Sequence, residues 1–187
     1  MNSFNYFSYG SNMLIERLQA RCPGARLVGC GEARGYRLDF FKRSKDGSGK
    51  AMPRAVDDNK QRLHGLLFEI PVKERGDLDK AEGEGYGYDR QEDFPIHLAG
   101  DGTKLDVTTY IANSKYIDVA LKPFDWYLAL VIAGARQHGL PEAYIENMCS
   151  VPCEMTVPEP GNRGREQALE ALRASGYDNF QQLLLPR

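Results

Sequence analysis

The chain has 187 residues, of which 42% are hydrophobic. This length suits one domain with a well-filled core and is short for two, since domains typically contain about 100–150 residues. A formal net charge of −2, from 24 basic and 26 acidic side chains, supplies no basic field for a phosphate backbone, so we expect no nucleic-acid partner.

The first expected element is an aromatic strand over residues 4–9, with Tyr6 and Phe7 on opposite faces. It leads into the turn Gly10-Ser11-Asn12 and then into MLIERLQARC (13–22), which has apolar residues at helical spacing. A turn directly before a helix points unpaired backbone N–H groups at one spot, at the positive end of the helix. Such a corner can bind a carboxylate or a developing oxyanion, although an ordinary capped helix gives the same pattern.

Strands dominate the first half of the chain and helices the second. Residues 27–41 predict one or two strands, and the polar, glycine-rich residues 42–50 predict an exposed loop. Further strands are expected at 62–71, 93–97 and 105–113. Helices are expected at 72–83, 123–140, 141–149 and 165–177.

Glu82 falls in the last turn of the short helix that stops at Gly83. The negative end of a helix disfavours a charged carboxylate, and burial adds to this effect, so both raise a glutamate pKa toward the range of a general base. A solvated glutamate at a helix end is the ordinary alternative. Glu84 competes for the role, but its flanking glycines indicate a less fixed backbone.

Other kinds of site find little support in the sequence. No stretch approaches the roughly 20 apolar residues that cross a bilayer, and the start MNSFNYFSYG lacks the layout of a signal peptide, so we expect no membrane partner and a cytoplasmic location. Four cysteines are too few for a disulfide scaffold, and no histidine lies near Cys149 and Cys153 to complete a zinc site. No serine-hydrolase elbow or P-loop is present, and we expect no metal.

Three segments together resemble the γ-glutamylcyclotransferase family in residue type and order: YFSYGSNM (6–13), LDKAEG (78–83) and WYLALVIAGARQHGLPEAY (126–144). The resemblance covers roughly residues 4–150. It implies an α+β fold, a small mixed β-barrel flanked by helices, in a domain spanning residues 1–150. Residues 151–187 are expected to form a C-terminal extension with one helix packed on the same domain.

The resemblance also implies a site and a reaction. Glu82 becomes the acid/base residue of a cofactor-free reaction that releases 5-oxoproline and a free amine or amino acid from a small γ-glutamyl substrate. Tyr127 looks like the family's substrate-contacting tyrosine, and Tyr116 has an uncertain counterpart. The residues implied to line the glutamyl site are Tyr6, Phe7, Ser8, Tyr9, Gly10 and Ser11, with Asn12 completing the loop.

The leaving amine and the oligomeric state stay open at this point. The branch of the superfamily that is specific for glutathione carries Tyr-Gly-Ser-Leu at the loop, whereas this chain has Ser11-Asn12-Met13, which argues against glutathione. One alternative is a cyclotransferase of the same fold acting on a γ-glutamylamine or a carrier-bound γ-glutamyl group. Another is a binding module without catalysis, which would not need Glu82.

Overall fold

The structure of the chain, a computed structural model, describes residues 2–157 and 162–185. Its strands are β1 (Ser3–Ser8), β2 (Arg26–Arg34), β3 (Tyr36–Arg43), β4 (Gly49–Ala55), β5 (Arg62–Pro71), β6 (Tyr88–Leu98) and β7 (Lys104–Ala112). Its α-helices are α1 (Ile15–Gln19), α2 (Arg75–Glu82), α3 (Asp125–Gln137), α4 (Glu142–Cys149) and α5 (Arg163–Ala174). Short 3₁₀ helices are η1 (Ser11–Met13), η2 (Val72–Glu74), η3 (Ser114–Tyr116) and η4 (Phe180–Leu184).

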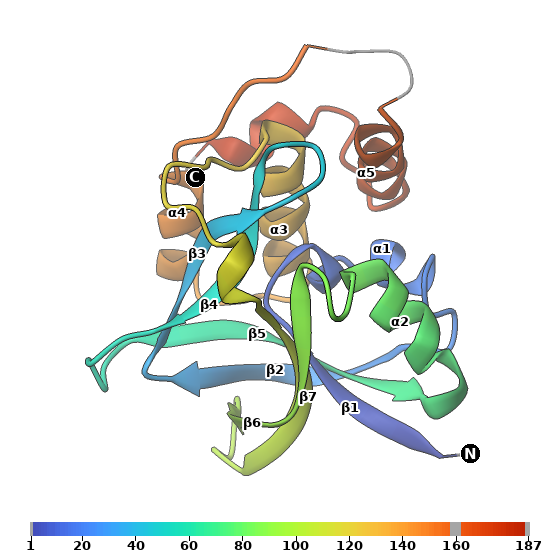
Figure 1. Cartoon of the computed structure of the whole chain (residues 1–187), viewed down its shortest axis with the longest axis vertical. Coiled ribbons are helices and arrows are strands. Elements are labelled where there is room, and N and C mark those ends of the chain that lie inside the picture. The colour runs from blue at the N-terminus through green and yellow to red at the C-terminus, as the bar shows by residue number, and fades with distance from the viewer. Residues whose placement is uncertain (1, 158–161, 186–187) are drawn as a thin grey trace.

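Five strands close into a barrel in the order β1-β5-β2-β6-β7. Strand β1 pairs in parallel with β7 through Tyr6 and Thr108, and the other pairs in the barrel are antiparallel. Figure 1 shows the barrel at the bottom and α3, α4 and α5 gathered above it. The predicted α+β class, with a small mixed barrel flanked by helices, is confirmed. Within the described ranges, no helix combines the length and apolar character needed to cross a bilayer.

The alternation of β1 sends its side chains to two different places. Phe7 is fully buried and stacks on Phe94 of β6, with ring centroids 6.2 Å apart, inside the barrel. Tyr6 and Ser8 point to the opposite face of the strand, as the period of two requires. That second face lies toward the helices and carries the site described below.

Helix α3 is the centre of the helical layer. All residues from Asp125 to Ala135 are buried, which is the pattern of a helix enclosed on every side. It contacts η1, α4, α5 and η4. A Cβ built on Gly134 would lie 2.5 Å from the backbone nitrogen of Leu14, so only a glycine allows this close approach of α3 to the chain after η1.

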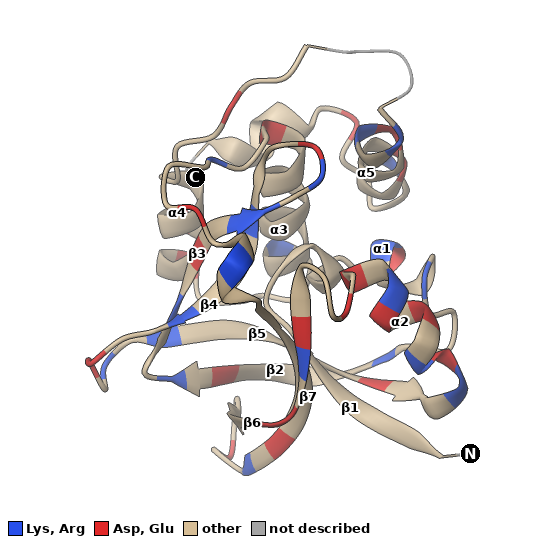
Figure 2. Cartoon of the chain, in the orientation of Figure 1, with Lys and Arg blue, Asp and Glu red and all other residues tan. Residues whose placement is uncertain are grey.

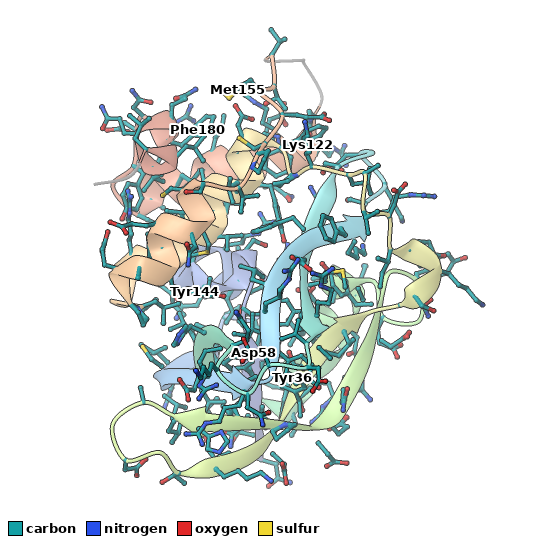
Figure 3. The ribbon with its side chains drawn as sticks, turned by 90° about the vertical axis from the view of Figure 1, so that its left-hand side faces the viewer. Tyr36, Asp58, Lys122, Tyr144, Met155 and Phe180 are labelled. Atoms are coloured by element: carbon teal, nitrogen blue, oxygen red, sulfur yellow. The ribbon has the colours of Figure 1, made fainter. Side chains whose placement is uncertain are left out.

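The exposed loop predicted at residues 42–50 is instead part of the β3–β4 hairpin. Only a turn at 44–48 is free of strand structure, closed by the amide of Ser44 donating to the carbonyl of Ser48. Strand β4 was not predicted, because its start is polar and Pro53 interrupts it; a proline is tolerated in this two-stranded sheet. In Figure 3, Tyr36 lies at the base of the hairpin near the barrel, and Lys122 lies near its far end, where its carbonyl accepts from the Gly49 amide at 2.8 Å.

Candidate active site

The chain turns sharply where β1 ends. The carbonyl of Gly10 accepts a hydrogen bond from the Met13 amide at 3.0 Å, which starts the 3₁₀ helix η1. No acceptor among residues 2–157 and 162–185 is found for the amides of Gly10, Ser11 and Asn12. The corner thus offers backbone donors to a ligand. The helix that follows is shorter than predicted, because η1 and Leu14 precede the five residues of α1.

Glu82 is the last residue of α2, and Gly83 ends the helix in the left-handed conformation, with φ 68° and ψ 46°. Its side chain is 16% exposed. Oxygen Oε1 accepts from Asn12 Nδ2 at 2.7 Å and from a terminal guanidinium nitrogen of Arg21 at 3.3 Å. Arg21 also donates to Asn12 Oδ1 at 2.7 Å, so the three side chains hold one another at the mouth of the corner.

The carboxyl of Glu82 and the corner line one small cavity. Its volume is about 30 Å³, which holds a water molecule but is too small for a glutamyl group. A larger ligand could enter only if some of these side chains moved apart. The lining residues come from β1, the corner, β4, α2, β6, β7 and α3, and they are Tyr6, Ser8, Tyr9, Gly10, Ser11, Asn12, Ala51, Glu82, Tyr88, Tyr110 and Tyr127.

The tyrosines of this cavity form a neutral polar wall. Burial raises the pKa of Tyr127 to about 12 and raises the pKa of Tyr6 further above its ordinary value. They stay protonated at neutral pH and can donate hydrogen bonds. Tyr6 Oη accepts from Asn12 at 3.1 Å, and Tyr127 Oη accepts from the Ala51 amide at 3.1 Å.

Known proteins with similar sequences and structures were compared with this chain. The model of the AIG2-like family matches residues 62–148. γ-Glutamylcyclotransferase from Bos taurus is 26% identical over 153 residues, covering 80% of this chain and 79% of that protein. The Homo sapiens enzyme is 24% identical over the same shares. A solved γ-glutamyl cyclotransferase structure superposes with a TM-score of 0.78 at 22% identity, covering 90% of this chain and 99% of that one.

Over most of its length the chain is thus similar to γ-glutamylcyclotransferases in sequence, and it shares their fold. The alignments with the two sequence relatives cover most of the length of those proteins. The solved structure, at its lower identity, adds the shared fold.

The structure brings together most of the residues that the family resemblance assigns to the site. Phe7 is the exception, because the alternation of β1 turns its ring into the barrel, away from the cavity. Glu84 and Tyr116 are also outside the cavity lining. Glu84 is exposed beyond the end of α2, and Tyr116 lines a separate groove on the outer side of Glu82.

Two arginines near the corner were not predicted from the sequence. Arg17 lies in α1 and Arg21 lies in the turn that follows the helix, four residues further on, and both side chains reach the corner. The Arg17 Nε donates to Ser11 Oγ at 3.2 Å. Burial, reinforced by the charge of Arg21, lowers the pKa of Arg17 to about 10, and it stays cationic at neutral pH. Their i, i+4 spacing is a weak signal in the sequence, because α1 has only five residues.

Across residues 2–157 and 162–185, no group of three or more His, Cys, Asp or Glu side chains is placed to hold a metal ion. The polar groups of the cavity are a carboxylate, amides and phenols, which suit an organic substrate with charged ends.

Lys50 lies behind the cavity, in a pocket of aromatic rings. Its Nζ is 4.4 Å from the ring centroid of Tyr127 and 4.6 Å from that of Trp126, and it pairs with Asp46 at 2.9 Å. Burial lowers the pKa of Lys50 from 10.5 to about 8, although Asp46 opposes the shift. The folded chain thus disfavours the ammonium form. Between about pH 8 and pH 10.5 the unfolded chain keeps the proton on Lys50 and the folded chain does not. The contribution of Lys50 to the free energy of unfolding therefore rises with pH over this range.

We expect the fluorescence of Trp126 to report this ionisation, since it is the only tryptophan in the chain. A charge that disappears next to the indole should shift its emission with a midpoint near pH 8. The measurement is an emission titration of the native protein beside a Lys50→Met variant. The variant should lose the step near pH 8. A step that persists in Lys50→Met would assign the titration to another group.

Proposed function

We propose that this chain is a γ-glutamylcyclotransferase, which cleaves a γ-glutamyl compound to 5-oxoproline and a free amine or amino acid. One observation carries the proposal: Glu82 lines the same cavity as Gly10, Ser11 and Asn12, whose amides have no acceptor among the described residues. A base and a set of oxyanion donors are the two requirements of an intramolecular acyl transfer. The names of the sequence relatives agree with this activity.

In the proposed reaction, Glu82 is the acid/base residue. The α-amine of the substrate has a reference pKa of about 7.7–8.0, so at neutral pH its proton must first be removed. Glu82 takes that proton, and the nitrogen attacks the γ-carbonyl carbon to close a five-membered ring. The bond from this carbon to the leaving nitrogen then breaks, and Glu82 returns the proton to the departing amine. No metal or cofactor enters the sequence of steps.

The backbone amides of the corner have two possible partners in this reaction. They hold the tetrahedral oxyanion, or they hold the α-carboxylate of the substrate. Arg17 and Arg21 favour negative charge at the corner in either case. Arg21 also keeps the carboxylate of Glu82 oriented while Asn12 makes way for the substrate. Since the attack is intramolecular, folding the glutamyl chain into its reactive shape supplies much of the acceleration.

A panel of γ-glutamyl compounds tests the proposal. The purified protein is incubated with a γ-glutamyl amino acid, a γ-glutamylamine and glutathione, and 5-oxoproline is quantified by mass spectrometry. We expect 5-oxoproline from at least the first compound and little from glutathione. Release only from the γ-glutamylamine would favour the alternative substrate class. Binding of the compounds without any 5-oxoproline would identify a binding module and refute the enzymatic proposal.

Gly10→Val should weaken substrate binding. A Cβ on Gly10 would lie 3.1 Å from the Ala51 Cβ and 3.6 Å from the Tyr127 Oη, and the branches of valine would fill the remaining space between them. We expect KM to rise about tenfold or more, since a side chain here blocks close approach to the backbone donors. The measurement is a steady-state assay of 5-oxoproline release, with circular dichroism to verify folding. An unchanged KM in a folded variant would contradict the assignment of the corner.

A further inference from the structure

Glu82 faces two hollows. On one side lies the small inner cavity, and on the other lies an open groove of about 450 Å³ between the β3–β4 hairpin and the C-terminal end of α2. Figure 2 shows basic positions on the hairpin and on α2, and both elements contribute lining residues to this groove. Glu82 is the one residue that lines both.

The outer groove is strongly basic. Among its described lining residues are Lys42, Arg43, Lys45 and Lys80, and Glu82 is the one acidic residue. Asp118 neutralises Arg43 through an ion pair at 2.9 Å. Lys45 and Lys80 are exposed, and neither forms an ion pair with another described residue.

The remaining cation lies deeper in the groove. Lys42 is half-buried and its Nζ is 4.5 Å from the ring centroid of Tyr88, a residue that lines the inner cavity. The positive field therefore extends from the open end of the groove to the neighbourhood of Glu82. This excess of positive charge is local, because the whole chain has a net charge of −2.

This arrangement assigns the groove to the leaving amine. If the glutamyl group occupies the inner cavity, the nitrogen that Glu82 protonates lies at Glu82, and the rest of the amine can extend into the outer groove that Glu82 also lines. We propose that the groove selects γ-glutamyl compounds whose leaving amine is anionic, that is, an acidic amino acid or a short acidic peptide. Amines with an additional positive charge, such as lysine and polyamines, are repelled. The inference rests on the proposed cyclotransferase activity.

Three substrates of similar size separate charge from shape. They are γ-glutamyl-glutamate, γ-glutamyl-glutamine and γ-glutamyl-lysine, the last linked through the lysine α-amine. We expect kcat/KM to fall in that order, with the glutamate compound at least about fivefold better than the glutamine compound, as one added charge near several exposed lysines allows. Raising the ionic strength from about 0.05 M to about 0.5 M should reduce this ratio, since salt screens exposed charges.

Variants identify the lysines responsible. The double variant Lys45→Gln, Lys80→Gln should bring the glutamate-to-glutamine ratio of kcat/KM close to one. The matched control is Lys73→Gln, Lys104→Gln, which removes the same charge from exposed positions outside the groove and should keep the ratio. A ratio that falls equally in both variants would show a general charge effect and overturn the role of the groove.

The outcomes also separate this inference from the proposed function. Release of 5-oxoproline from all three substrates at equal rates would leave the cyclotransferase activity standing and refute the charge selection. Preference for the lysine compound would refute it as well and would favour a γ-glutamylamine substrate. Absence of 5-oxoproline from every γ-glutamyl compound would refute both.

Discussion

Glu82→Gln should lower kcat/KM for 5-oxoproline release by about 10²–10⁴-fold, the range over which a general acid/base residue contributes. The substitution keeps the size of the side chain and an oxygen that can still accept from Asn12 Nδ2 and Arg21. It removes the negative charge that pairs with Arg21, and with it the ability to take a proton from the substrate and give it to the leaving amine. Most of the loss should therefore appear in kcat, with a smaller change in KM.

Glu84→Gln is the matched control for this experiment. Glu84 is two residues further on, exposed and outside the cavity, so its neutralisation should change kcat/KM by less than about twofold. Thermal melting of both variants verifies that the fold is intact. A folded Glu82→Gln protein that releases 5-oxoproline at the native rate would end the proposed role of Glu82.

Gly134→Ala should destabilise the chain by about 1–3 kcal/mol, the typical cost of forcing an extra methyl group into a packed interior. The added Cβ would lie 2.5 Å from both the Leu14 nitrogen and the Met13 carbonyl carbon, and 2.7 Å from the Met13 Cβ. Two of these atoms are backbone, so no side-chain rotation relieves the clash. Helix α3 and the corner must separate, which should also disturb the amides that follow Gly10.

Urea denaturation measures this effect, with Gly76→Ala as the control. Gly76 lies in α2, and a Cβ built there meets nothing within 4 Å. Alanine at an exposed helix position should stabilise the chain by up to about 1 kcal/mol. Equal stability of Gly134→Ala and the native protein would mean that α3 does not press on the corner as the structure indicates.

Strong local patterns allowed much of the fold to be predicted. Strand β5 begins and ends where its apolar run predicts, at Arg62 and Pro71, and Gly83 ends α2 as expected of a C-terminal glycine. The uninterrupted apolar stretch of α3 likewise predicted a buried helix. In these cases the residues themselves carry the information, because burial or backbone conformation allows few alternatives.

Features that depend on contacts between distant segments could not be predicted from the sequence. Phe7 was assigned to the site with its neighbours, although only the closed barrel decides which face of β1 turns inward. Lys50 was placed in an exposed loop, because its aromatic partners lie more than 70 residues away in α3. Arg17 and Arg21 reach the corner only when α1 folds back over it, and α1 is too short to show a clear pattern.

The contacts among Asn12, Arg21 and Glu82 have a consequence for turnover. These groups satisfy one another, so an incoming γ-glutamyl compound must compete with these internal contacts, and its charged ends have to replace each contact that breaks. 5-Oxoproline competes less well, because it has a neutral lactam nitrogen where the substrate has an ammonium group to offer Glu82. The contacts among Asn12, Arg21 and Glu82 should therefore re-form after each reaction and speed the release of 5-oxoproline.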